Sequence, residues 1–474
     1  MPEVILPGTY IDVRAEGLIS AGRISTGNIG IVGTAAKGPI NEVILLSSLA
    51  EAKAIFGDSD DWIGGENYEL TLIRSLDLVY RNGGRTVYAV RTGLHGTSNK
   101  AFGKASYSVK QGTTSLLTLD AGSPGSWGNE IKLVITAPKD PAAATAKTTV
   151  VLRYGFVQET YEIRNAAELS KQINAKSRLV KASSPTTANQ DKVPDAIAEG
   201  LLAGGKNGAE ATATDYDQSL ALLENQEVNL VLLAGQGITA DDRSMASVLE
   251  GHLKMTSEIK RERMGIIGSG FDDGQDSFDD AIAHNLNNER LLFVTPGIIV
   301  TANGQKNRLP GGYLAATMAG LISSLAVQAS PTNKVLAIEG LTAEFNSSQL
   351  EKLVQNRVCA VEKRNGFRVV KGITTHDAAW QQITTRRIVD YAIYGVRSGC
   401  DPYIGKLNND RVRGAMKATL DGFLTRMVDN EALVSYQLEV SATRAQEVAG
   451  EAIVTMTLMP TFSIDFIKVT MYLS

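Results

Sequence analysis

The chain has 474 residues, of which 43% are hydrophobic and 21% are charged, a composition typical of folded protein rather than of disordered or fibrous chains. Its 47 basic and 51 acidic residues give a net charge of −4, so no overall charge favours nucleic acid or an anionic membrane as a partner. No apolar run approaches the roughly 20 residues that cross a bilayer, and the N-terminus lacks the regions of a secretory signal. We therefore expect a soluble protein made in the cytosol, with about three or four domains.

The first 92 residues predict an arm followed by a small α/β segment. Residues 1–24 alternate short apolar runs with proline and glycine, which is typical of an extended arm that has no core of its own. Over residues 25–92, strand-like runs flank two helices. On the second helix Leu72, Leu76 and Val79 recur on one face.

Three further segments and a terminal arm follow. Short β-rich runs separated by loops predict an inserted small β-sandwich over 93–195. Strands and helices alternate over 205–358, which predicts a mostly parallel sheet covered by helices. Two long helices and several strand-like runs predict an α+β domain over 359–462, and 463–474 has the alternation of an arm strand. The predicted fold class is therefore mixed α/β and α+β, in several domains.

The stretch IGIVGTAAKGPINEV, residues 29–43, contains half of a phosphate-binding loop. Gly33 and Gly38 have the spacing of the glycines in G-x-x-x-x-G-K-[ST], but Pro39 and Ile40 stand where the lysine and the hydroxyl belong. No cation is therefore placed for the β and γ phosphates, and no oxygen for magnesium. We interpret the stretch as a strand followed by a turn in which Gly38 supplies backbone freedom.

Other patterns that an enzyme requires are incomplete. Asp215, His252 and Ser269 occur in the order of a subtilisin triad, yet neither His252 nor Ser269 lies in a protease signature. The acidic stretch at 266–280 lacks the spacing of an EF-hand, and the four histidines and two cysteines form no metal-binding motif. We expect no catalytic residue, no cofactor and no metal; an α/β hydrolase or a nucleotide-binding enzyme is the remote alternative.

Several segments together resemble the tail sheath protein of contractile phages and of related phage-tail-like injection particles. The resemblance includes the arm LPGTYIDV, the segment IGIVGTAAKGPINEVILLSSLAEAKAIFG, and SPGSWGNEIKLVI at the start of the inserted domain. It continues through PGGYLAATMAGLISSLAVQASPTNKVL to RRIVDYAIY and NNDRVRGAMKATLDGFLTRMVDNEAL. Each pattern is structural, and the specificity lies in their order along most of the chain.

The resemblance implies a structural subunit rather than an enzyme. Such a subunit would polymerise around an inner tail tube and contract on a baseplate trigger, driving the tube through a target envelope. It implies tail terminator proteins as further partners and no direct contact with nucleic acid or membrane. It also implies a subtilisin-like, non-catalytic fold for 205–358, a C-terminal domain that faces the tube, and a place in the virion tail after assembly in the host cytoplasm. A sheath of a bacteriocin-like or extracellular injection particle is the alternative.

In the family that this chain resembles, both arms add strands to a sheet of a neighbouring subunit. The C-terminal DFIKVTMYLS alternates as a two-faced strand, and the first arm offers a short apolar run before Pro7. We therefore expect inter-subunit strand donation by Val4, Ile5, Leu6, Ile467, Val469, Met471 and Leu473.

The second long C-terminal helix is locally basic. Residues 406–426 include five basic and two acidic residues. Exposed charge pairs are individually weak, about 0–1 kcal/mol, which suits a contact that must be released. We expect Arg411, Arg413 and Lys417 to contact an acidic tube surface. The predicted buried stripe of this helix is Val412, Met416, Leu420, Phe423 and Met427.

Overall fold

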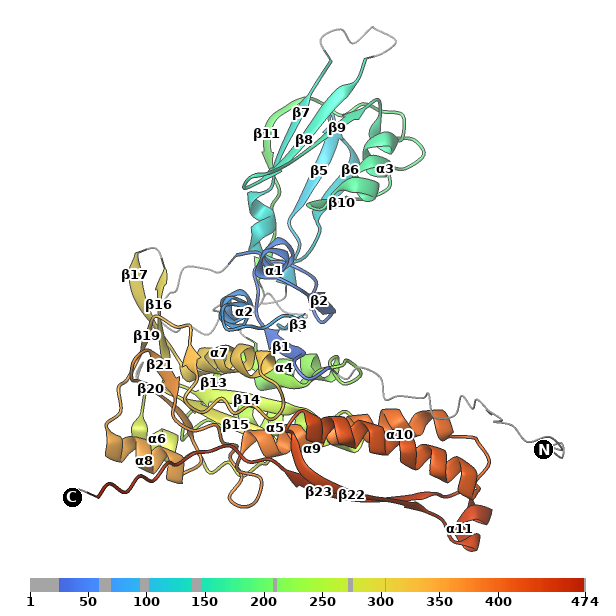
Figure 1. Cartoon of the computed structure of the whole chain (residues 1–474). Helices are drawn as coiled ribbons and strands as arrows, with labels where there is room; N and C mark the ends of the chain where they lie inside the picture. Colours follow the sequence, from blue (N-terminus) through green and yellow to red (C-terminus); the bar gives the residue numbers. More distant parts are fainter. Residues whose placement is uncertain are drawn as a thin grey trace, which may run out of the picture.

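The computed structural model describes residues 25–58, 70–93, 102–138, 146–207, 211–271, 276–302 and 304–472. Figure 1 shows a central α/β body, a β domain that projects from it, and a C-terminal part in which two long helices pack on a β-hairpin. The predicted mixed α/β, multidomain fold class is thereby confirmed at this level. The subtilisin-like relationship of the body stays a prediction.

A nine-stranded sheet forms the centre of the body. Its strand order is β18-β21-β20-β15-β14-β13-β1-β3-β2, and the strands from β20 to β3 run parallel, with antiparallel strands at both edges. The strands are β1 (Ile29–Gly33), β2 (Val43–Leu46), β3 (Val87–Arg91), β13 (Leu230–Ile238), β14 (Met264–Ser269), β15 (Leu291–Thr295), β18 (Val335–Leu336), β20 (Cys359–Lys363) and β21 (Phe367–Val369). Strands from the predicted segments 25–92, 205–358 and 359–462 therefore share one sheet.

Helices cover both faces of this sheet (Figure 1). Ile29 and Ile31 of β1 pack with α1, α2 and α7, whereas Val32 packs on the opposite side with α4, α5, α6 and α8. Because both faces are covered, the central strands are continuous apolar runs rather than alternating ones. The helices are α1 (Leu49–Phe56), α2 (Thr71–Arg81), α4 (Ala213–Ala221), α5 (Ser244–Glu258), α6 (Phe278–Ile282), α7 (Gly311–Ser324) and α8 (Ser347–Gln355). A small sheet of β16 (Ile298–Ala302), β17 (Gln305–Leu309) and β19 (Gly340–Leu341) adjoins the body.

The projecting domain consists of two antiparallel sheets, β10-β6-β5 and β11-β7-β8-β9, around one apolar core, with a short β4–β12 pair. Its elements are β4 (Phe102–Gly103), β5 (Ser106–Gln111), β6 (Thr114–Ala121), η2 (Ser126–Glu130), β7 (Lys132–Thr136), β8 (Thr148–Tyr154), β9 (Val157–Ile163), α3 (Ala166–Lys176), β10 (Val180–Ala182), β11 (Ile197–Leu201) and β12 (Lys206–Asn207). Since β11 pairs with β7 and β12 with β4, the domain continues past residue 195, where the sequence analysis ended it.

The C-terminal part is built on two helices that the sequence predicts well. Its elements are α9 (Ile383–Cys400), η3 (Asp401–Tyr403), α10 (Asp410–Asp429), β22 (Leu433–Ser441), α11 (Arg444–Ala449) and β23 (Ile453–Pro460). The predicted stripe of α10 is confirmed, because Met416, Leu420, Phe423 and Met427 are buried and Val412 packs beside them. Asn409 caps α10 by accepting a hydrogen bond from the Val412 amide.

Candidate assembly surfaces

The hairpin β22–β23 has one covered face and two open edges. Tyr436, Leu438 and Met456 turn inward and pack against the helices, whereas the alternate residues, such as Glu439 and Thr455, are exposed. Within the described residues, β22 and β23 pair only with each other. Each outer edge therefore presents backbone N–H and C=O groups that a further strand could pair with.

The segment that follows β23 is fixed at its start and exposed beyond it. The Asp465 carboxylate lies 3.5 Å from the Lys371 ammonium and accepts a hydrogen bond from Gln382 at 3.3 Å. Beyond this point Ile467, Val469 and Met471 are 81%, 73% and 83% exposed. Such a run of exposed apolar side chains is unfavourable unless another surface covers it. The predicted donors Val4, Ile5, Leu6 and Leu473 lie outside the described residues.

Of the three residues predicted to contact the tube, Arg413 differs from the expectation. Its side chain is buried, and its guanidinium pairs with Asp410, with Glu447 at 3.0 Å and with the Asn408 side chain at 2.7 Å. The idea that Arg413 offers a solvent-facing cation is therefore wrong, because α11 supplies the acidic partner Glu447 from 34 positions along the chain. Arg411 and Lys417 are exposed on α10, and their contact with a tube stays a prediction.

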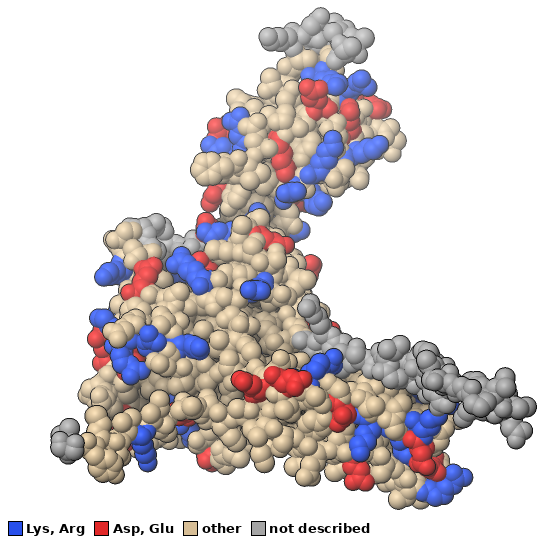
Figure 2. Space-filling model, in the orientation of Figure 1, with Lys and Arg blue, Asp and Glu red and all other residues tan. Residues whose placement is uncertain are grey.

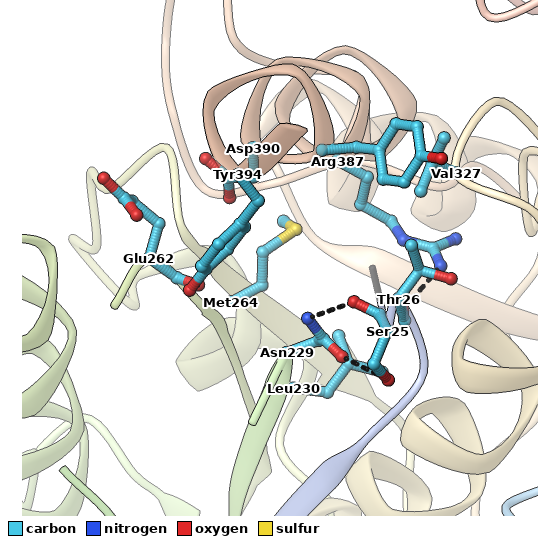
Figure 3. A pocket seen from close by; sticks show the side chains of 11 residues that line it. Ser25, Thr26, Asn229, Leu230, Glu262, Met264, Val327, Arg387, Asp390 and Tyr394 are labelled. Carbon is cyan, nitrogen blue, oxygen red and sulfur yellow. Dashed lines mark hydrogen bonds between the residues drawn. The ribbon is translucent and has the colours of Figure 1, made fainter. Parts of the chain in front are cut away.

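Residues 25–28, which directly precede β1, form a short stretch that we call the arm root. Asn229 brackets it: its side-chain amide donates to the Ser25 carbonyl at 3.0 Å, and its side-chain oxygen accepts from the Asn28 amide at 3.0 Å. Arg387 of α9 donates to the Thr26 carbonyl at 3.3 Å. Figure 3 shows Ser25 and Thr26 between Asn229 on the sheet side and Arg387 on the helix side.

Buried ion pairs join α9 to the central sheet. Arg290 makes a two-pronged contact with Asp390, at 2.7 and 3.0 Å, and Arg386 donates to the same carboxylate and to Glu289. Arg290, Arg386 and Asp390 are each less than one tenth exposed. Paired guanidinium and carboxylate groups at this depth are stabilised only in one geometry. The orientation of α9 on the sheet is therefore narrowly specified.

A second ion pair lies farther along α9. Arg397 donates through both guanidinium branches to Glu262, and the Tyr394 hydroxyl donates to the Glu262 backbone carbonyl at 2.9 Å. Burial raises the pKa of Glu262, but the hydrogen bonds and charge of Arg397, a backbone hydrogen bond and the charge of Arg290 together outweigh burial and hold the pKa below its usual value.

Between α9 and the arm root is a cavity of about 30 Å³, lined by residues that include Asn229, Glu262, Asp390 and Tyr394. A water molecule needs about 10–15 Å³, so the cavity holds no more than about two waters and no organic ligand. A neighbouring cavity of about 160 Å³ shares Ser25, Asn229 and Tyr394. The smaller cavity is therefore a gap in a packed junction rather than a substrate site.

The turn of residues 34–39 docks the β domain. The Gly38 amide donates to the Ser123 hydroxyl at 2.8 Å, and Arg91 donates to the carbonyls of Gly38 and Pro124 at 2.7 and 2.8 Å. Gly38 has φ of +98°, which confirms that this position requires glycine's backbone freedom. The same stretch that resembles half of a phosphate loop therefore connects two parts of the fold.

Lys37 also contributes to this contact between the body and the β domain, which we call the β-domain joint. Its ammonium donates to the Ala54 carbonyl at 3.0 Å and lies 4.9 Å from the centre of the Trp127 ring and 5.6 Å from that of Tyr154. Burial lowers the pKa of Lys37. The lysine is thus engaged in the joint and turned toward aromatic side chains of the β domain.

The residues that resembled a catalytic triad make separate contacts. Asp215 caps α4 through Thr212, His252 contacts Arg263, and Ser269 contacts Thr295, with no hydrogen bond joining the three among the described residues. Burial, together with Arg263, lowers the pKa of His252 to about 3, so its ring is neutral near pH 7. In the described part of the chain, no group of three metal-ligating side chains converges. No helix among those residues is long and apolar enough to cross a membrane.

The chain matches two domains of one protein family. Residues 209–375 match the phage tail sheath protein central domain, and residues 375–474 match the phage tail sheath C-terminal domain. Together these matches include more than half of the 474 residues. The chain therefore belongs to the phage tail sheath protein family.

Individual relatives agree with this assignment. The chain is 28% identical over 180 residues to the tail sheath protein of Staphylococcus phage Twort, a match that includes 37% of this chain and 29% of that protein. It is 28% identical over 178 residues to a putative tail sheath protein of Enterococcus phage phiEF24C, with 35% and 31% covered. The matched region is thus less than a third of the length of these relatives.

The fold is similar to solved sheath structures over nearly the whole chain. A sheath tail protein from Desulfitobacterium hafniense has a TM-score of 0.64 at 16% identity and covers 96% of this chain and 100% of its own. The contracted helical sheath of the anti-feeding prophage has a TM-score of 0.56 at 14% identity, with 99% of both chains covered. At such low identity the likeness concerns the fold alone.

Proposed function

We propose that this protein is the structural subunit of a contractile tail sheath, without enzymatic activity. Subunits polymerise around an inner tube in an extended state and contract when a baseplate is triggered, which drives the tube through a target envelope. Family membership and the fold of nearly the whole chain support the proposal. The assembled protein would lie in the virion tail after assembly in the host cytoplasm, with a tail terminator as a further partner.

The observation that carries the proposal is that one subunit has both open strand edges and an exposed apolar segment that could pair with such an edge. The hairpin β22–β23 has two unpaired edges, and the C-terminal segment places Ile467, Val469 and Met471 in solvent. A strand of about five residues adds four or five hydrogen bonds, each worth roughly 0.5–1.5 kcal/mol net. This is sufficient to hold neighbours together while their bodies move. The donors Val4, Ile5, Leu6 and Leu473 would complete the exchange.

The outer face of α10 is the proposed contact with the tube. Arg411 and Lys417 are exposed there, whereas Arg413 holds α11 against α10 and acts only indirectly. Contacts of exposed lysine or arginine with carboxylates contribute about 0–1 kcal/mol each, so the tube could be released during contraction.

Electron microscopy of the purified protein tests the proposal. The full chain should form hollow cylinders, and Val469→Pro should remain a folded monomer because proline removes a donor from the strand and restricts its backbone. Thr470→Ala, one position away, is the matched control and should form cylinders. Normal cylinders from Val469→Pro would show that the C-terminal segment is not part of the contact between subunits. An absence of cylinders from the wild type, with and without its tube protein, would contradict the proposed function.

A further inference from the structure

Arg387 on α9 is a buried cation whose acceptors are backbone carbonyls. Its guanidinium donates to Leu325 at 2.9 Å, to Ala326 at 3.1 Å and to Thr26 at 3.3 Å, and the side chain is 5% exposed. Burial lowers its pKa to about 10. This differs from Arg386, the preceding residue, which contacts carboxylates.

The carbonyls at Arg387 come from two distant segments. Leu325 is the C-cap residue of α7 and Ala326 follows it, and the C-terminal end of a helix favours a cation. Thr26 belongs to the arm root, 361 positions away from Arg387. One planar guanidinium on α9 therefore joins the C-terminal end of α7 to the arm root. Figure 3 shows it beside Thr26.

Asn229 holds the arm root from the opposite side. The Asn229 side chain contacts Ser25 and Asn28, and in addition the backbone N–H of Asn229 donates to the Asn28 carbonyl at 2.9 Å. The Asn28 side chain also donates to the Glu227 carbonyl at 2.7 Å. The backbone of the arm root is thus fixed at several successive positions before β1 begins.

We propose that Arg387 and Asn229 clamp the arm root, at the base of the proposed N-terminal arm, to α9 and to the sheet, so that residues 25–28 are fixed relative to α9. This inference rests on the proposed function, in which that arm links neighbouring subunits. A pull on the arm then passes through Thr26 and Arg387 directly into α9. Helix α9 packs on α10 and, with it, on the hairpin β22–β23. The arm root, which would give an arm to a neighbour, and the hairpin β22–β23, which would receive one, are therefore connected through α9 and α10 within one subunit.

Hydrogen–deuterium exchange on the unassembled subunit tests the clamp. Arg387→Met keeps an apolar stem but removes the three donated bonds. We expect exchange over residues 25–32 to rise at least about tenfold, which corresponds to the loss of one or two hydrogen bonds from a charged donor. Asn229→Ala should give the same local rise from the other side. The matched control is Arg386→Met, equally buried on the same helix, which should leave exchange at the arm root unchanged.

Unchanged exchange at the arm root in Arg387→Met or Asn229→Ala would overturn the clamp. An equal rise in Arg386→Met would also overturn it, because the effect would then be a general loosening of α9. Should Arg387→Met fail to fold, Arg387→Lys and Asn229→Ala decide the question by the same criterion. The measurement needs no polymer, so it is separate from cylinder formation by the wild type, which tests the proposed function.

In cylinders, the same variants test whether force from the arm reaches α9. Polymers of Arg387→Met should dissociate at a lower denaturant concentration than polymers of Arg386→Met, once each midpoint is corrected for the stability of the monomer. Equal corrected midpoints would show that force from the arm does not pass through Arg387.

Discussion

The central sheet carries two appended parts, and different chemistry holds each of them. At the β-domain joint, Lys37 and Arg91 are cations that donate to neutral carbonyls and face aromatic rings. No ion pair crosses that joint between residues 25–93 and 102–207, as far as these ranges are described. The contact of α9 with the central sheet, which we call the α9 seam, contains by contrast a buried ion pair between Arg290 and Asp390.

The difference reflects what each contact has to do. The β domain projects from the body (Figures 1 and 2) and buries its own core around Trp127 and Leu152. The joint therefore has only to set the direction of this domain. The helices α9 and α10 bury a smaller apolar cluster and have to be oriented on the sheet. A buried ion pair contributes little net stability but strongly penalises wrong geometry. A buried ion pair therefore suits the α9 seam, through which the arm root and the hairpin β22–β23 are connected.

The largest effect is expected from Asp390→Asn. This change leaves Arg290 and Arg386 without their shared carboxylate, and breaking a buried pair costs about 3–5 kcal/mol. Denaturant unfolding should show this loss. The control is Asp77→Asn, which breaks the exposed pair with Arg81 and should cost less than about 1 kcal/mol. Equal losses of stability from the two substitutions would mean that the buried ion pair of α9 contributes no more than an exposed pair.

A smaller effect is expected at the other joint, from Gly125→Ala. The added Cβ would clash with the Ala36 carbonyl oxygen, and Gly125 has φ of +141°. We expect about 1–3 kcal/mol of destabilisation and faster hydrogen exchange in residues 123–127, with unchanged exchange in the core of the β domain. Gly112→Ala is the control, since Gly112 has φ of +60° with open space around it. Equal changes of hydrogen exchange in residues 123–127 for both variants would show that the close contact of Gly125 with Ala36 does not stabilise the joint.

The smallest effect is expected from lowering the pH. It should change hydrogen exchange at the α9 seam but not at the β-domain joint. The pKa of Glu262 in the fold lies below its usual value of 4.5, so this carboxylate contributes stability at higher pH. That contribution is lost as the pH falls through the folded-state pKa. Exchange around Tyr394 and Arg397 should therefore differ between the wild type and Glu262→Gln at pH 6, and the difference should shrink toward pH 3.

The β-domain joint provides the reference for that experiment. Its cations donate to neutral carbonyls, so residues 123–127 should exchange alike in the wild type and in Glu262→Gln at every pH. A pH-dependent difference at this joint would show that the two junctions are not independent.

Local pattern predicted much of the secondary structure. The apolar spacing of α10 identified Met416, Leu420, Phe423 and Met427 as buried, because the helical period places them on one face. The requirement for glycine at Gly38 also followed from the turn that the sequence predicts. Helical spacing did not predict the surroundings of Arg413, since spacing shows which residues share a face but not that Glu447 covers that face.

The sequence by itself determined the strands, the helices and, through the order of its segments, the likeness to tail sheath proteins. These follow from periods of two and 3.6 residues, which burial imposes on neighbouring positions. Only the tertiary structure decided that Arg290 meets Asp390, 100 positions away, that Arg387 reaches Thr26, and that the half phosphate loop around Lys37 docks a domain. The physical reason is that such contacts depend on how whole elements pack, and no local spacing encodes the partner.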